Sequence, residues 1–371
     1  MELFQSLLQD VLNNPSERQS YPFFHLKALN HLSACRTDKL GGHAQYCEDG
    51  HLNGVWYNSC KHRFCPRCQH INKEQWIQNS HRVLLNCPHH HIVFTLASEL
   101  NILWKYNRHL LSDLLFEAAQ ETLKAFSRDK RYLNAMPGML CALHTWGRDL
   151  NFHPHLHVLV SHGGLNAQGD WVEPRKRHLF PQKPVMLVFR GKYLSKLKAR
   201  VEASDIQLPP NYCRGKVMNL LRRLYRKDWV VNFSERYDHA RGVAKYLGRY
   251  LKGGPFRASQ LVHLNDDRVK FQYKSHKTKR FEHVMLSKEA FAQRLVQHVP
   301  LPGKPSLRYG GLYVSSVREK LNTARQRLGQ GAVAERIELK WDVYLLALGH
   351  LPVCSECGKL LTEKRAIARK H

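Results

Sequence analysis

The stretch Phe152-His153-Pro154-His155-Leu156-His157-Val158-Leu159-Val160-Ser161 decides how the rest of the chain is interpreted. Its aliphatic residues alternate with histidines, which predicts a strand that is buried on one face. Successive side chains of a strand point to opposite faces, so His155 and His157 share one face while Leu156 and Val158 lie in the core. Two imidazoles about 7 Å apart along a strand can bind one divalent ion.

A third ligand is expected from the preceding strand. That strand is predicted from Met139 to Trp146, and a turn around residues 149–151 joins it to the histidine strand. It carries His144, which a hairpin partner would bring close to His155. His153 is the alternative, because the sequence does not fix the register. The chain has 24 histidines, and such spacings also arise by chance. We predict a site of His144, His155 and His157.

Two tyrosines form the second candidate feature. A helix is predicted over 238–252, where Tyr246 and Tyr250 lie about one turn apart on the same face. A phenol is a poor nucleophile near neutral pH because its pKa is about 10, but a metal ion that polarises a phosphate makes it competent. The spacing alone also fits two half-buried core residues. Three cations beside the tyrosines are candidate DNA contacts: Lys245, Arg249 and Lys252.

Cysteines and histidines gather between residues 35 and 68. Thiolates and imidazoles bind Zn²⁺ tetrahedrally, and a closed site stabilises a segment that lacks its own core. We predict at least one structural zinc ion, with either one or two sites. The expected ligands are Cys35, Cys47, His51, Cys60, Cys65 and Cys68, with His43 as a further candidate. The C-terminal pair Cys354-x-x-Cys357 is half a site, which either borrows His350 or a spare N-terminal cysteine or consists of two reduced thiols.

The charge of the chain predicts a polyanionic partner. Lys and Arg number 58 against 30 Asp and Glu, which gives a net charge of +28, and nucleic acid is the commonest partner of such a protein. Cations lie beside aromatic residues in a hairpin predicted over 268–286, a combination that fits single-stranded DNA. The candidate contacts outside the tyrosine helix are Arg222, Arg223, Lys270 and Lys274.

Several classes of protein are disfavoured. No apolar run reaches the length of about 18 residues that a spanning helix needs, and the N-terminus lacks the features of a secretory signal. Cysteines grouped with histidines suit metal binding in a reducing compartment, so we expect a cytoplasmic protein. The motif G-x-x-x-x-G-K-S/T is absent, so no nucleotide cofactor is expected.

In chain order, these motifs resemble the IS91-type rolling-circle transposases, which include IS801-like and IS1294-like members. The resemblance rests on the Cys/His cluster, His144-Thr145-Trp146-Gly147, His153 to His157, Gly163-Gly164 and Tyr246 to Leu251, and it extends from about Cys35 to about Leu328. It implies an HUH nuclease that cleaves single-stranded DNA at the transposon ends through 5′-phosphotyrosine intermediates, with Mg²⁺ or Mn²⁺. Tyr246 and Tyr250 would be the nucleophiles of a two-tyrosine member, and His155 and His157 would be metal ligands.

The expected fold is α+β: an HUH nuclease domain, which is an antiparallel sheet with flanking helices, preceded by a zinc-binding module. We predict an N-terminal helix plus zinc-binding module over 1–88, the catalytic domain with the tyrosine helix over 89–300, and a basic C-terminal region with the CxxC motif over 301–371. Two alternatives to a transposase remain. One is a rolling-circle replication initiator or relaxase, and the other is a zinc-dependent nucleic-acid-binding protein without catalysis.

Overall fold

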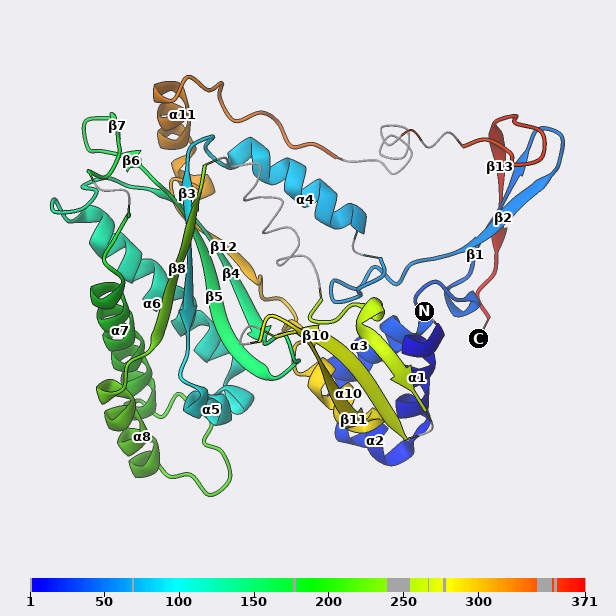
Figure 1. The fold of residues 1–371 in the computed structure, drawn as a ribbon, viewed down its shortest axis with the longest axis horizontal. Coiled ribbons are helices and arrows are strands. Elements are labelled where there is room, and N and C mark those ends of the chain that lie inside the picture. Colours follow the sequence, from blue (N-terminus) through cyan, green and yellow to red (C-terminus); the bar gives the residue numbers. More distant parts are fainter. Residues whose placement is uncertain are drawn as a thin grey trace.

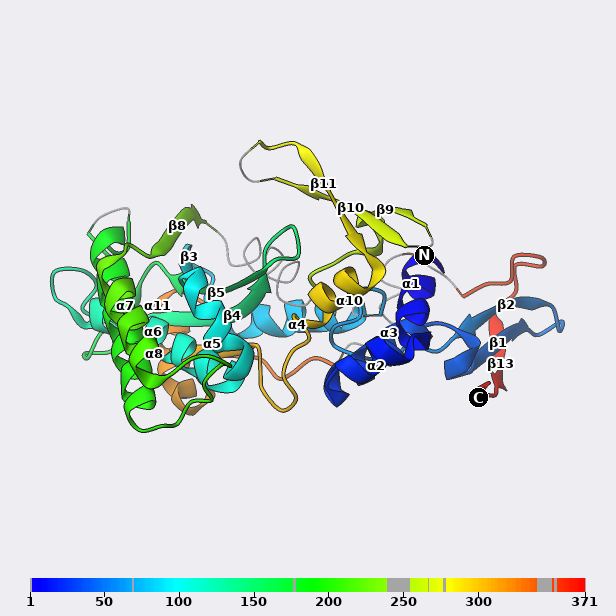
Figure 2. The same cartoon turned by 90° about the horizontal axis from the view of Figure 1, so that it is seen from below.

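The computed structural model describes residues 2–68, 70–175, 178–238, 254–265, 267–275, 278–338, 349 and 352–370. The predicted residues Lys245, Tyr246, Arg249, Tyr250 and Lys252, and also His350, lie outside the described residues. The molecule is elongated, with a large sheet and its helices at one end and a small sheet at the other (Figures 1 and 2). No helix among the described residues combines the length and the apolar character needed to span a bilayer.

The large sheet contains the predicted histidine strand. It has five strands in the order β12 (Leu307–Gly311), β4 (Gly138–Trp146), β5 (Phe152–Ser161), β3 (His89–Thr95) and β8 (Val230–Tyr237). All neighbouring strands are antiparallel. The predicted bounds of β5 match the structure. The predicted bounds of β4 differ only at its start, which is Gly138 and not Met139. The sequence did not predict β8 and β12, which are the two edge strands.

Helices cover the face of the sheet opposite the histidines. The layer consists of α5 (Asn101–Tyr106), α6 (Arg108–Arg128), α7 (Gln182–Glu202) and α8 (Arg214–Arg226). Leu156 and Val158 are fully buried against it, as the alternating pattern predicted. A break at Asn107 separates α5 from α6. The Asn107 side chain donates to the carbonyl oxygens of Leu103 and Gln207 and so competes with the helical backbone.

The histidine face is covered in part. The helices α4 (His70–Val83) and α11 (Arg318–Arg327) pack over its Leu140 and Leu159, together with Tyr313. A short ribbon of β6 (Gly164–Leu165) and β7 (Trp171–Val172) adjoins them. The remaining histidine-bearing end of the face lies towards the middle of the molecule (Figure 1).

A second core joins the N-terminal helices to residues 256–299. It contains α1 (Glu2–Asn13), α2 (Pro15–Ser20), α3 (Phe23–Ala34), α10 (Lys288–Val296) and a sheet of β9 (Leu261–Leu264), β10 (Arg268–Lys274) and β11 (Phe281–Ser287). Phe256, Phe271 and Phe291 pack against one another at its centre. The N-terminal helices are therefore held by residues far along the chain.

The small end sheet has the order β13 (Leu361–Ile367), β1 (Gly42–Cys47) and β2 (Leu52–Tyr57). Residues 301–371, which we predicted to be one C-terminal region, divide between two sheets: β12 lies in the large sheet and β13 pairs with β1. The predicted mixed fold of helices and antiparallel sheets is confirmed.

Candidate active site and metal centres

Three histidines of the large sheet converge on one point. His144 of β4 is the direct cross-strand partner of His155 of β5, and His157 lies two residues farther along β5 on the same face. One ring nitrogen from each of the three lies within 4.8 Å of the others. The ring centroid of His144 is 4.4 Å from that of His157 and 5.5 Å from that of His155. The structure thus brings together the three histidines that the sequence singled out.

The surroundings of these rings fit a metal ion. His155 Nδ1 donates to the carbonyl oxygen of His153 at 2.7 Å, which leaves Nε2 of His155 as its ligand atom. Burial lowers the pKa of His155 to about 4 and holds the pKa of His157 well below its ordinary value. Neutral imidazole is the form that binds a metal. The ring of His153, the alternative ligand, is not in the cluster and contributes only its carbonyl oxygen.

His91 is a residue of this site that our sequence analysis missed. It lies on β3, and its Nε2 is 2.8 Å from Nδ1 of His157, with the two rings stacked. This hydrogen bond fixes the orientation of the His157 ring, as is usual for groups that support a metal ligand. The alternation of side chains along β3 could have indicated His91. It lies opposite Leu159, on the same face of the sheet as the histidines of β5.

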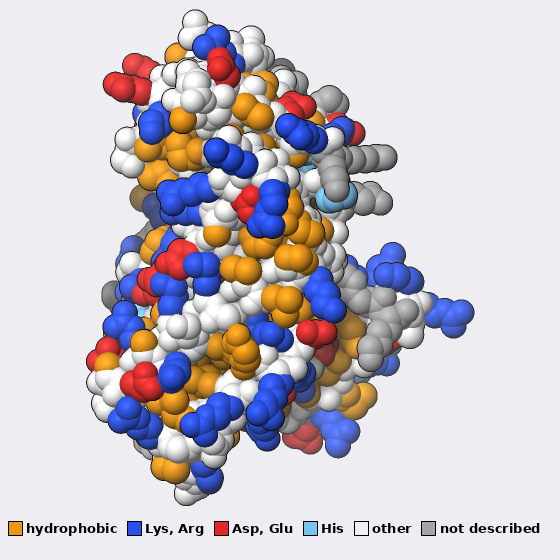
Figure 3. All heavy atoms as spheres, turned by 90° about the vertical axis from the view of Figure 1, so that its left-hand side faces the viewer, with side chains coloured by type: hydrophobic (Ala, Val, Ile, Leu, Met, Phe, Trp, Pro, Cys, Tyr) orange, Lys and Arg blue, Asp and Glu red, His pale blue; other side chains and the backbone are white. Residues whose placement is uncertain are grey.

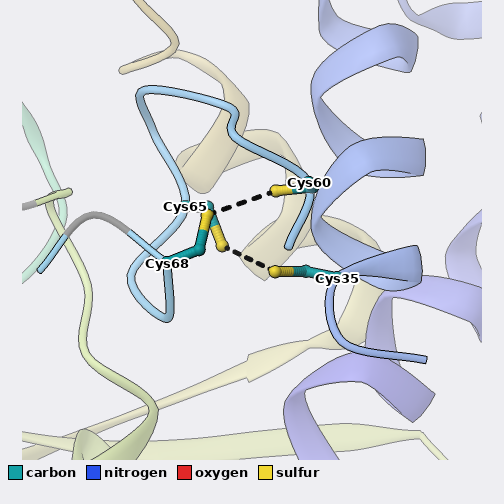
Figure 4. Close-up of side chains that lie close together, drawn as sticks. All are labelled: Cys35, Cys60, Cys65 and Cys68. Atoms are coloured by element: carbon teal, nitrogen blue, oxygen red, sulfur yellow. Dashed lines mark hydrogen bonds between the residues drawn. The ribbon is translucent and has the colours of Figure 1, made fainter. Parts of the chain in front are cut away.

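Four cysteines form a first candidate zinc site. The thiols of Cys35, Cys60, Cys65 and Cys68 turn toward one another (Figure 4), and their sulphur atoms all lie within 4.8 Å. The Sγ atoms of Cys35 and Cys65 are 3.5 Å apart, and those of Cys60 and Cys68 are 3.6 Å apart. Hydrogen bonds from Cys35 and Cys60 hold the pKa of the Cys68 thiol far below its ordinary range. All four side chains belong to the second hydrophobic core.

The other two predicted zinc ligands lie in a separate cluster. Cys47 and His51 meet Cys354 and Cys357, with all four ligand atoms within 4.8 Å. The C-terminal pair therefore meets the N-terminal ligands Cys47 and His51 and does not stand alone. His43 is in neither cluster, and its ring stacks on Trp56.

The predicted DNA contacts of the hairpin line one exposed face. Lys270 lies opposite Met285 and Lys274 lies opposite Phe281 in the register of β10 and β11. Phe281 and Met285 are more than half exposed. Arg148, in the turn between β4 and β5, donates to the carbonyl oxygen of Lys274 at 2.9 Å. This hairpin face is therefore tied to the turn that joins the two strands of the histidine site.

Arg222 and Arg223 are placed elsewhere. They are exposed on α8, within the helical layer on the opposite face of the large sheet from the histidines. Lys and Arg side chains are scattered over that side of the molecule among hydrophobic ones (Figure 3). The structure does not bring these two arginines to the histidine cluster.

A pocket of about 290 Å³ lies where α5 and α6 meet the ends of β4 and β12, and its lining includes none of the three histidines. Trp146 forms part of its wall and also stacks on His144, with ring centroids 4.6 Å apart. Arg63 of the zinc module and Arg108 of α6 also line it, and within the described residues neither has a carboxylate at ion-pair distance. Burial lowers the pKa of Arg108. Asp113, which also lines the pocket, pairs with Lys304 and Arg308, so the pocket has an excess of positive charge.

Comparisons with known proteins agree on one family. A family model described as "Putative transposase" matches residues 138–320, and one described as "Transposase zinc-binding domain" matches residues 3–96.

The chain is 31% identical to "Putative transposase y4qJ" of Sinorhizobium fredii over 83% of this chain and 79% of that protein. It is 32% identical to the "Transposase for insertion sequence element IS801" of Pseudomonas savastanoi pv. phaseolicola, over 79% of this chain and 71% of that protein. No solved structure matches it significantly. The resemblance noted in the sequence is confirmed, and the chain belongs to the IS91-type family of transposases.

Proposed function

We propose that the chain is a DNA strand transferase of the HUH type, which cleaves and rejoins single-stranded DNA at the ends of its transposon in the cytoplasm. The observation that carries the proposal is the convergence of His144, His155 and His157 at one end of the sheet, in a member of a transposase family. On this proposal residues 89–300 form the catalytic domain and residues 1–88 form the zinc module, with the strands after residue 301 completing both.

The three histidines would hold Mg²⁺ or Mn²⁺. Burial lowers the pKa of His155 and of His157 and so favours their neutral rings, and the carbonyl oxygen of His153 and the ring of His91 orient these two. Three imidazoles leave coordination positions for oxygen atoms of a phosphodiester and of water. The ion would polarise the phosphate, and the chain's own part is to hold that phosphate next to the nucleophile.

Tyr246 or Tyr250 would be that nucleophile. Its phenol oxygen bonds to phosphorus, the bond from phosphorus to the 3′ oxygen breaks, and the phenol proton ends on the released 3′-hydroxyl. A second tyrosine can cleave a second strand while the first holds its 5′-phosphate. Both tyrosines lie between two described positions, Asp238 after β8 and Gly254 at the edge of the pocket. Lys245, Arg249 and Lys252 would neutralise phosphates beside them.

Single-stranded DNA would contact two further surfaces, which adjoin the strands that carry the histidines. The exposed face of β10 and β11 combines Lys270 and Lys274 with apolar side chains, on which bases stack. The pocket between Arg108 and Trp146 has the volume and the positive charge to take one unstacked nucleotide. Arg222 and Arg223 are left out of this path because they lie behind the sheet.

The test is a covalent adduct assay with single-stranded oligonucleotides from the element's ends. Wild-type protein with Mn²⁺ is expected to form a protein–DNA adduct that resists denaturant. Each of Tyr246→Phe and Tyr250→Phe should reduce the adduct, and the double variant should abolish it. Duplex DNA of the same sequence is the control and should give little adduct. An undiminished adduct from the double variant would rule out the proposed nucleophiles.

A further inference from the structure

We propose that Cys47, His51, Cys354 and Cys357 bind a second structural zinc ion, and that this ion fastens the C-terminal strand of the chain to the N-terminal module. The family model for the zinc-binding domain ends at residue 96 and so contains only two of these four ligands. The other two lie about 300 residues later in the sequence. The proposal does not depend on the proposed chemistry at the histidines.

The donor atoms have the spacing of a tetrahedral zinc site. The Sγ atoms of Cys47 and Cys357 are 3.6 Å apart, and Nδ1 of His51 is 3.5 Å from the Sγ of Cys47 and 4.0 Å from that of Cys354. Zinc–sulphur bonds of about 2.3 Å at tetrahedral angles separate two sulphur atoms by about 3.8 Å. Three thiolates and one imidazole are a common ligand set for structural zinc.

The backbone around each half is shaped as a ligand turn. Gly50 lies three residues after Cys47 and has a φ of 80°, and Gly358 lies directly after Cys357 and has a φ of 74°. Glycine adopts these positive φ values without strain. The N–H of Gly50 donates to the carbonyl oxygen of Cys47, and the N–H of Glu356 donates to the Sγ of Cys354 at 3.4 Å. A backbone N–H that donates to sulphur, as that of Glu356 does, stabilises the thiolate. Both halves are therefore tight turns that present their ligands on one side.

Other contacts hold the two halves in register. The strand β13 pairs with β1 from Gly42↔Ile367 to Cys47↔Leu361. Lys359 pairs with Asp49 at 2.6 Å, and the N–H of Ser355 donates to the side-chain oxygen of Asn53 at 3.1 Å. These contacts bring the CxxC turn to Cys47 and His51, but exposed ion pairs contribute little free energy.

The end sheet needs such an ion because it has no core of its own. Within the described residues, no side chain of β1, β2 or β13 belongs to any of the three hydrophobic cores. Leu52, Val55, Trp56 and Tyr57 are exposed. A small sheet that buries so little apolar surface is usually stabilised by metal. The first site differs, because its four cysteines lie inside the second core.

The second ion is therefore expected to be the more easily removed. The side chain of His51 is 40% exposed, whereas every cysteine of the first site is at most 9% exposed. A chelator should remove one zinc ion rapidly and the other slowly. Loss of the fast ion should free residues 352–370 while the large sheet and the second core stay folded.

The experiment compares full-length wild type with Cys354→Ser/Cys357→Ser and with the matched control Cys213→Ser, whose cysteine is exposed and in neither cluster. Wild type and control should contain two zinc ions per chain by elemental analysis, and the double variant should contain one. In protein loaded with Co²⁺, the thiolate charge-transfer absorbance should fall by about three parts in seven, because the first site has four thiolates and the second has three.

Limited digestion with trypsin tests whether the second zinc ion fastens the C-terminal strand or is merely bound. In the double variant trypsin should cleave early at Lys359, Lys364 and Arg365, while the rest of the chain resists as in wild type. One zinc ion in wild type, or two in the double variant, would overturn the second site. Equal resistance of the C-terminal strand in both proteins would overturn its role as a fastening.

Discussion

His144 and His155 face each other directly across β4 and β5, so two candidate ligands that lie eleven residues apart in sequence occupy one cross-strand pair. A one-residue change of register would send one of the two rings to the helical face. The pairing of Leu140 with Leu159 farther along the same face, under α4 and α11, opposes such a slip. The packing of the sheet therefore positions the site.

The histidine site can be separated from the fold by two changes on opposite faces of the same strand pair. His144→Ala should weaken Mn²⁺ binding and slow adduct formation by roughly 100-fold or more, because it removes a ligand. Its zinc content should not change. Leu156→Ala should lower the free energy of unfolding by about 2–5 kcal/mol, because Leu156 is fully buried, and should leave Mn²⁺ affinity near that of wild type.

Calorimetric titration with Mn²⁺ and urea unfolding measure the two effects. If His144→Ala bound Mn²⁺ as tightly as wild type, His144 would not be a ligand.

His91 should act as a positioning residue. His91→Phe keeps an aromatic ring but removes the nitrogen that bonds to His157, so Mn²⁺ affinity should fall by about 10- to 100-fold. His90→Phe is the matched control, since His90 points to the other face of β3 and contacts His162. Mn²⁺ titration of both variants checks this. Equal affinities for the two would mean that the contact between His91 and His157 does not orient a ligand.

The hairpin cations should act on phosphates. Lys270→Gln/Lys274→Gln should weaken binding of single-stranded DNA similarly for all sequences. It should also reduce the slope of log K against log salt by about 1.4, at about 0.7 for each phosphate contact. Arg222→Gln/Arg223→Gln removes the same charge behind the sheet and should leave adduct formation unchanged. Fluorescence anisotropy over a salt series measures the slope, and an equal loss in both double variants would contradict the proposed path.

The pocket beside Trp146 should recognise one unstacked base. An oligonucleotide series in which each position in turn is abasic should show a loss of affinity concentrated at one position near the cleavage site. Arg108→Gln should weaken the intact oligonucleotide, because it removes a buried cation that lines the pocket. Removal of the base should therefore reduce the affinity of Arg108→Gln by a smaller factor than it reduces the affinity of wild type. A uniform abasic profile would exclude a nucleotide in this pocket.

His298 should make stability fall in mild acid. Its Nε2 donates to the carbonyl oxygen of Leu150, its Nδ1 accepts from the Thr145 hydroxyl, and burial lowers its pKa from 6.5 to about 4. The unfolded state therefore binds a proton more readily. This contribution to stability is complete above pH 6.5 and is lost as the pH falls toward 4, up to about 3 kcal/mol.

Urea unfolding of wild type and His298→Gln between pH 7 and pH 4 isolates this contribution. The difference in stability between the two should shrink as the pH falls, and a constant difference would contradict the assignment.

The sequence alone predicted the parts of the fold that depend on one periodic pattern. The alternation in residues 152–161 predicted the strand, its core face and the two histidines that share the other face, and the nearby turn led to His144. The edge strands β8 and β12 were missed because their partners come from distant parts of the chain. The break at Asn107 cannot be predicted from local patterns, because the Asn107 side chain bonds to Gln207, far along the chain.

The zinc ligands show the same limit. Their residue types could be recognised from spacing, but seven candidates could not be divided between sites without the fold. The pairing of β1 with β13 brings Cys47 and Cys357 together, and nothing local to either residue indicates that partner.

That pairing also sets an order for events during synthesis. The middle strand of the end sheet, β1, is made about 300 residues before β13, so it lacks one of its two neighbouring strands until β13 has been made. The first zinc site can close while translation continues, since its four cysteines all lie before residue 69. The end sheet can be completed only after β13 has been made, so a chain terminated before residue 361 would lack it.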